Sequence, residues 1–149
     1  AHAGAWIELA NQTDLTTTTN TANAAATKAN AAATLTAVQT FTAGQRGEVT
    51  ALTDASSIAT NLALSNNFAI TLGGSRTLAN PTSAVAGQSG SIFITQDGTG
   101  SRTLAYGSNF KFAGGTAPTL STTAAAVDRL DYVVKASTQI HAVVSLDVK

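Results

Sequence analysis

Apolar and polar residues alternate in short stretches through residues 44–149, where Gly, Asn, Pro and Ser mark the turns between the stretches. An alternation of period two is typical of half-buried β-strands. It predicts nine strands, at residues 48–52, 58–64, 67–72, 76–80, 91–97, 102–106, 110–113, 127–136 and 140–148. So many short strands in about 100 residues predict an antiparallel β-sandwich or a small barrel.

The alternation in the last two predicted strands is regular enough to predict how they pair. Their apolar residues face one side when a three-residue loop, 137–139, joins the strands as a hairpin. This register pairs Leu130 with Leu146, and it places Arg129 opposite Asp147, where the opposite charges attract. Together with two aromatic residues of earlier strands, the hairpin supplies the expected core: Phe68, Phe93, Leu130, Tyr132, Val144 and Leu146.

A second regularity lies in the middle of the strand-rich region. The string GSRTLA occurs at 74–79 and again at 100–105, and each copy follows an apolar stretch, NFAITL or SIFITQ. Each unit therefore has the pattern of a strand, a Gly-containing turn and a second strand. We expect two equivalent β-hairpins, with Arg76 and Arg102 just beyond their turns.

Before the strands, residues 10–40 contain no Gly or Pro and consist mainly of Ala, Thr and Asn. TANAAAT (21–27) is followed at once by KANAAAT (28–34), and a repeat of seven residues is typical of helices that supercoil with partner helices. We expect a helix over 14–43, with Asp14 as its N-cap. The residues expected to form its oligomer seam are Ala24, Ala31, Leu35, Val38 and Phe41.

This helix is expected to be weak by itself, because Thr loses side-chain freedom in a helix and Ala buries little area. A thin bundle of several chains is therefore favoured. A flexible linker and a helix that lies on another protein are the alternatives.

Residues 1–13 carry an isolated apolar patch formed by Trp6, Ile7 and Leu9. A patch of this kind indicates either a plug that docks into another protein or an unordered chain end. We favour the plug, and residues 1–13 are then an attachment segment.

The composition of the chain disfavours several classes of partner and site. Charged residues make up 11% of the chain, and eight basic residues balance eight acidic ones. This balance favours neither nucleic acid nor an anionic membrane surface, and so little charge suits a chain held in an assembly. There is no Cys, so disulfides and thiolate sites are excluded. No apolar run approaches the roughly 18 residues of a membrane span, and no export signal is evident. The chain is expected to be soluble, without membrane insertion.

Candidate chemistry is sparse. His141 alternates with apolar residues on the face opposite the core and faces Lys135 in the expected register, so no carboxylate orients it. The string DGTGS (97–101) lacks the Lys and the following helix of a phosphate-binding loop. Asp128 and Asp131 point to opposite faces of one strand and cannot share a metal ion. We therefore expect no enzyme, no cofactor and no metal site.

Three long strings resemble a β module found at the C-terminal end of virion structural proteins of tailed bacteriophages, of the tail fibre or minor structural protein type. They are FTAGQRGEVTALTDA (41–55), TLGGSRTLANPTSAVAGQSGSIFITQDGTGSRTLAYG (71–107) and KFAGGTAPTLSTTAAAVDRLDYVV (111–134). The resemblance covers about residues 41–149 and brings no catalytic residues with it.

The resemblance implies a non-enzymatic, homotrimeric virion protein that is assembled in the host cytoplasm. Residues 1–13 would attach to the particle, 14–43 would form a three-chain coiled-coil stalk, and 44–149 would form an outward β head. Its partners would be itself, other virion proteins such as a tail adaptor or the major capsid protein, and a glycan or protein of the host surface.

Other functions remain as alternatives. One is a capsid decoration protein that stabilises the phage head. Another is a bacterial trimeric adhesin, which the missing export signal disfavours. A polysaccharide-cleaving spike is disfavoured by the shortage of carboxylates and aromatic residues.

Overall fold

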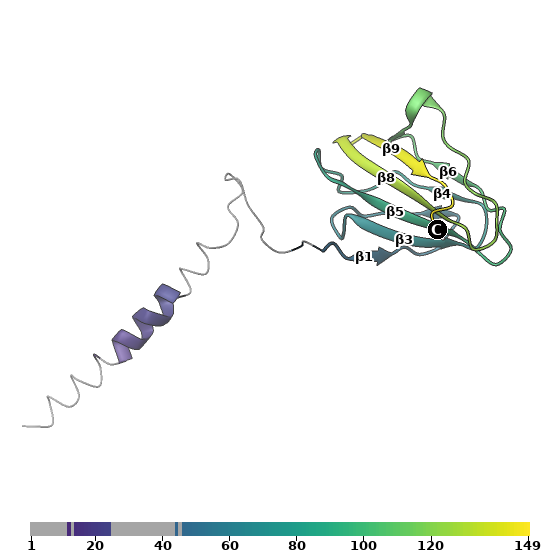
Figure 1. Ribbon diagram of the computed structural model, residues 1–149. Coiled ribbons are helices and arrows are strands. Elements are labelled where there is room, and N and C mark those ends of the chain that lie inside the picture. The colour runs from purple at the N-terminus through teal and green to yellow at the C-terminus, as the bar shows by residue number, and fades with distance from the viewer. Residues whose placement is uncertain (1–11, 13, 25–43, 45) are drawn as a thin grey trace, which may run out of the picture. The chain divides into compact units, whose positions relative to one another are not determined.

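The computed structural model of the chain describes residues 12, 14–24, 44 and 46–149 (Figure 1). The chain divides into two units, Ala1–Gln45 and Arg46–Lys149, and each is described by itself.

In the first unit, residues 12 and 14–24 are helical. Asp14 is not the N-cap, because Gln12 before it is already helical. Thr side chains donate to the carbonyl four residues earlier, for example Thr18 Oγ1 to Asp14 O at 2.9 Å. Such bonds satisfy the hydroxyl but add no contact with another element.

Most residues assigned to the stalk seam and to attachment lie outside the described residues. Ala24 is helical. The others are Ala31, Leu35, Val38 and Phe41 of the seam, and Trp6, Ile7 and Leu9 of the attachment segment. The stalk and the attachment segment stay predictions.

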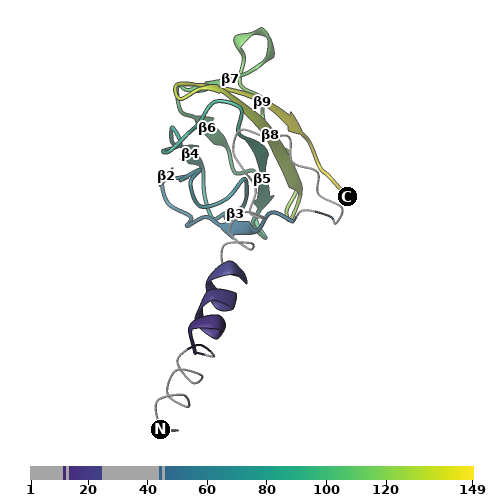
Figure 2. The same cartoon turned by 90° about the vertical axis from the view of Figure 1, so that its left-hand side faces the viewer.

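The second unit is mainly β. Its strands are β1 (Val49–Ala51), β2 (Ser57–Ile58), β3 (Asn67–Leu72), β4 (Arg76–Leu78), β5 (Ser89–Gln96), β6 (Leu104–Tyr106), β7 (Phe110–Lys111), β8 (Val127–Ala136) and β9 (Gln139–Ser145), with a 3-10 turn at Ala113–Gly115. They form a six-stranded sheet in the order β1-β3-β5-β8-β9-β7 and a three-stranded sheet in the order β2-β4-β6. Figure 2 shows the two sheets as separate layers. No closed barrel is formed by the described strands.

The first six strands are wound as three successive units and not as hairpins. In each unit the chain runs along the large sheet, turns, and crosses to the small sheet. As a result β1, β3 and β5 are mutually parallel, as are β2, β4 and β6. The expectation of an antiparallel sandwich with GSRTLA hairpins was therefore wrong. Both strands of a unit bury apolar residues between the sheets, so their alternation is the same in a crossover as in a hairpin.

The sequence repeat becomes a structural repeat with one offset. NFAITL lies beside SIFITQ residue by residue, from Asn67 and Ser91 to Leu72 and Gln96. In the small sheet, however, Arg76 lies opposite Leu104. The second turn has two more residues before its Ser-Arg pair than the first, so Arg102 falls in the turn and not in the strand.

The strands β8 and β9 form the predicted hairpin in a different register. Leu130 lies opposite Val144 and not Leu146, and a bulge occurs between Val134 and Ala136. Because the difference is two residues, the same residues still face inward. Arg129 consequently lies opposite Ser145 and not Asp147, so the predicted charge pairing was wrong.

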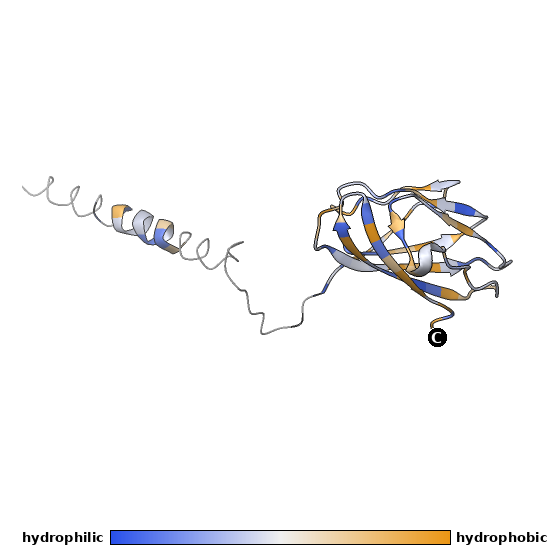
Figure 3. Ribbon diagram, turned by 90° about the horizontal axis from the view of Figure 1, so that it is seen from above, coloured by the Kyte–Doolittle hydropathy of each residue, from blue (hydrophilic) through white to orange (hydrophobic). Residues whose placement is uncertain are grey.

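The core lies between the two sheets, and orange and blue bands alternate along the strands in Figure 3. Phe68, Leu130 and Tyr132 are buried in it, and Val144 is partly buried against it. Phe93 is only half-buried, since it lies on the outer side of β5. Leu146 follows the end of β9 and is 53% exposed, so its assignment to the core was wrong for this chain.

Candidate functional site

The outer face of the large sheet carries its side chains in rows across the strands. Lys111 of β7 lies beside His141 of β9, and His141 lies opposite Val133 of β8. The next row contains Val143 and Asp131, which face each other across the same two strands. Residues distant in sequence are thereby placed side by side on one surface.

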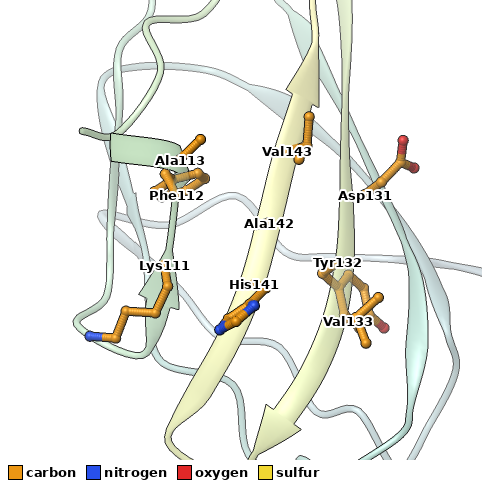
Figure 4. Close-up of a pocket in the computed structure, with 9 residues that line it drawn as sticks. All are labelled: Lys111, Phe112, Ala113, Asp131, Tyr132, Val133, His141, Ala142 and Val143. Atoms are coloured by element: carbon orange, nitrogen blue, oxygen red, sulfur yellow. The ribbon is translucent and has the colours of Figure 1, made fainter. Parts of the chain in front are cut away.

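These two rows line a surface groove with a volume of about 480 Å³ (Figure 4). Its walls come from residues 111–113, 131–133 and 141–143. Val133 and Val143 are 52% and 65% exposed in the groove, which gives it an apolar floor. Phe112 supports one side by packing its ring edge-on against Tyr106, with the ring centroids 4.8 Å apart.

The two ends of the groove differ in charge. At one end the side chains of Lys111 and His141 lie on adjacent strands, and Asp131 lies at the other end (Figure 4). Asp131 is already engaged, because it accepts a 2.6 Å hydrogen bond from Ser91 Oγ and a 3.0 Å bond from Arg129 Nε. Lys111 Nζ donates to the carbonyl of Ser108 at 2.7 Å.

The basic end is notable because most charges of the second unit are paired. The described ion pairs are Arg76 with Asp54, Arg102 with Asp97, Arg129 with Asp131, and Lys149 with Asp147.

Within Arg46–Lys149, the basic residues outside these pairs are Arg46, Lys111 and Lys135. Arg46 precedes β1, at the opposite edge of the sheet from β7. Lys135 is exposed and follows Val133 by two residues on the same face of β8. Two of these three basic residues, Lys111 and Lys135, therefore lie towards one end of the groove.

The remaining carboxylate of β8 has a structural role. Asp128 is 1% exposed and points inward, whereas Asp131 points outward, as the strand alternation predicts. Asp128 accepts backbone hydrogen bonds of 2.8 Å from Ser121 and from Asp147. It thus ties the loop before β8 to the segment after β9.

The described residues contain no cluster of three or more His, Asp or Glu side chains that could hold a metal ion. Within the groove, His141 and Asp131 lie in different rows, and Asp131 is held by Arg129 and Ser91. The arrangement is suited to binding a ligand and supplies no paired acid and base.

Sequence reasoning placed His141 correctly on the outer face but assigned the groove no role. The signal that it missed is the parallel pairing of β7 with β9, which brings Lys111 beside His141. The DGTGS string forms a turn, in which Asp97 Oδ1 accepts from the amides of Thr99 and Gly100.

The second unit is thus a two-sheet β domain with a groove on the outer face of its large sheet. The family model described as "Putative phage tail fibre C-terminal domain" matches residues 49–139. The chain belongs to this family and is a bacteriophage virion structural protein that associates with other virion proteins. The predicted phage resemblance is confirmed.

No curated protein and no solved structure matches the chain. In the described part of the chain, no helix is long and apolar enough to span a membrane.

Proposed function

We propose that the protein is a non-enzymatic, homotrimeric tail fibre or spike whose β head binds the host cell surface. The observation that carries this proposal is the outer-face groove, with its apolar floor and its unpaired basic end, on a tail fibre C-terminal domain. An exposed surface that combines apolar area with a few polar groups is typical of a ligand site. In this proposal residues 1–13 attach to the particle and 14–43 form the stalk.

Competition for adsorption tests host binding. The purified full-length protein, added before the phage, should reduce the rate at which the phage adsorbs to cells of its host. The Val85→Asp variant is a control and should reduce adsorption as well as the unmodified protein does, because Val85 is exposed and lies outside the groove residues. An adsorption rate that stays unchanged at saturating protein would argue against a host-binding head.

Cryo-electron microscopy of the intact particle tests location. Copies on the tail support a fibre or spike. Copies on the capsid lattice would instead identify a decoration protein of the head.

Sedimentation at micromolar concentration tests the oligomer. We expect a trimer, because a helix rich in Ala and Thr buries too little surface to be stable alone. A monodisperse monomer would reject the stalk.

Deletion of residues 1–13 tests attachment. If Trp6, Ile7 and Leu9 form an anchor, the shortened protein should keep its oligomeric state but no longer be incorporated into particles. Normal incorporation would show that the attachment site lies elsewhere.

A further inference from the structure

We infer that the outer-face groove binds an acidic saccharide, with the anionic group of the sugar held by Lys111 and His141 in the groove and by Lys135 just beyond it on β8. The inference rests on the proposed host-binding function and names the ligand class of that site.

The charge distribution supports an anionic ligand. Lys111 and Lys135 take part in no described ion pair, and the nearest carboxylate in the groove, Asp131, is neutralised by Arg129 at 2.9 Å. Both Lys111 and Lys135 are exposed. A carboxylate or phosphate at this end could therefore form charge-assisted hydrogen bonds with both ammonium groups. The described internal partner that it would displace is the Ser108 carbonyl, which accepts from Lys111.

The floor of the groove supports a sugar ring. Val133 and Val143 present apolar surface in adjacent rows, and Ala113 and Phe112 border it. The C–H face of a pyranose ring is apolar, whereas its edges carry hydroxyls. A ring lying on the two valines would keep its hydroxyls at the rim, and the volume of about 480 Å³ falls within the ordinary range for small ligands.

The Asp131 end of the groove indicates which way round the ligand lies. Asp131 accepts two hydrogen bonds, and a carboxylate has about four lone-pair sites, so it can also accept from a sugar hydroxyl. The ligand is thus expected to place its acid beside Lys111 and a hydroxyl beside Asp131.

Two other occupants fit less well. A nucleic acid requires a broader basic surface, since proteins that bind its backbone commonly contact about 6–10 phosphates. A second copy of this chain would present an overall neutral surface, with eight basic and eight acidic residues, to a site whose free charges are positive.

The test measures binding of the full-length protein by isothermal titration calorimetry to oligogalacturonate, oligosialate and a phosphorylated mannan, with maltooligosaccharide of equal length as the neutral probe. We expect at least one acidic probe to bind and the neutral probe to bind about tenfold more weakly or not at all. Carboxylate and phosphate probes distinguish the two kinds of acid. Binding of none of the acidic probes, or equal binding of the neutral one, would overturn the inference.

The matched variants remove two positive charges at different places. Lys111→Gln with Lys135→Gln should weaken the acidic probe about tenfold or more, whereas Arg46→Gln with Lys149→Gln should change it less than about twofold. Equal effects would show that only net charge matters. Sedimentation of the groove variant should match that of the unmodified protein, and a changed oligomeric state would make this face an interface between copies.

Adsorption assays separate this inference from the proposed function. If the unmodified protein blocks adsorption and the Lys111/Lys135 variant blocks it equally well, the head binds the host through another surface. If the unmodified protein fails to block adsorption although it binds an acidic probe, the host-binding function fails and the groove remains a saccharide site.

Discussion

Arg76 and Asp54 are joined by two hydrogen bonds, of 2.8 and 2.6 Å, across a sequence separation of 22 residues. Asp54 lies between β1 and β2, and Arg76 begins β4, so the pair connects the turns of two successive units. The corresponding residue of the second repeat, Arg102, pairs with Asp97 of its own turn at 2.8 and 3.0 Å. The same repeat residue therefore links two turns in one copy and closes a single turn in the other.

We predict that Asp54→Asn lowers stability at neutral pH and loses this effect in acid. The hydrogen bond from Arg76 lowers the pKa of Asp54. A lowered pKa in the folded state stabilises the protein above the ordinary aspartate pKa of about 3.9, and this contribution is lost as the pH falls through the lowered value. Urea unfolding at pH 7 and at pH 2 should show a difference that vanishes at the lower pH.

The control for this prediction is Lys149→Gln. Its partner distance is also short, at 2.7 Å, but the Lys149 side chain is 82% exposed. The change in the free energy of unfolding should stay within about 0.5 kcal/mol. A difference for Asp54→Asn that persists unchanged at pH 2 would mean that the carboxylate charge is not its cause.

Gly90 is predicted to be intolerant of a side chain. A Cβ at this position would overlap the carbonyl oxygen of Asn66 and would lie 2.8 Å from the Tyr132 hydroxyl. Gly90→Ala should therefore cost at least about 2 kcal/mol, since backbone must move to relieve the overlap. Gly98→Ala is the matched control, because no described residue lies within 4 Å of a Cβ added there, and its effect should stay within about 0.5 kcal/mol. Thermal unfolding of the two variants gives the comparison.

The strands that the sequence predicted best are those with long, regular alternation. The ranges expected for 67–72 and 127–136 agree with β3 and β8 at both ends. In contrast, only Ile58 of the stretch expected at 58–64 belongs to a strand, β2, and 110–113 is a strand only at Phe110–Lys111. Such short strands are defined by their pairing partners, which local sequence does not specify.

The direction of the strands was the main feature of the fold that the sequence did not predict. The candidate site was missed for the same reason, because it depends on the parallel pairing of β7 with β9. A Gly-rich turn permits either a return within one sheet or a crossing to the facing sheet, and both bury the same side chains. Gln96 is a residue whose role the local sequence does not reveal. It lies opposite Leu72 in the pairing of β3 with β5 and is 2% exposed. Its side-chain amide accepts a hydrogen bond from the N–H of Arg102 and donates one to the carbonyl of Arg102.

The two tyrosines are predicted to respond oppositely to removal of their hydroxyls. Tyr132 donates a 2.9 Å hydrogen bond to the Asn66 carbonyl, whereas the buried hydroxyl of Tyr106 has no hydrogen-bond partner among the described residues. Tyr132→Phe should cost about 1 kcal/mol, and Tyr106→Phe should be neutral or stabilising, since it removes an unsatisfied polar group. Chemical denaturation of both variants measures the difference. An equal loss in the two would mean that Tyr106 finds a partner in solution.

Alkaline titration provides an independent check on the same residues. Burial raises the pKa of Tyr106 and of Tyr132 to about 12. The chain has two Tyr, so the ultraviolet absorbance of phenolate should stay low until well above the ordinary value of about 10. A raised pKa stabilises the folded state fully below that value, and the contribution is lost as the pH rises towards 12.

The last prediction distinguishes the observed hairpin register from the one that alternation suggested. Leu130 is fully buried opposite Val144, and Leu146 lies beyond the end of β9 at 53% exposure. Leu130→Ala should therefore cost about 2–5 kcal/mol through lost burial and a residual cavity. Leu146→Ala should cost less than about 1 kcal/mol, because half of its side chain remains in water.

Thermal unfolding of these two variants at several protein concentrations separates the possible outcomes. A large effect of Leu146→Ala that is independent of concentration would favour the register that pairs it with Leu130. A large effect that disappears on dilution would instead show that a second copy covers Leu146, because an interface contributes to stability only while the copies are associated.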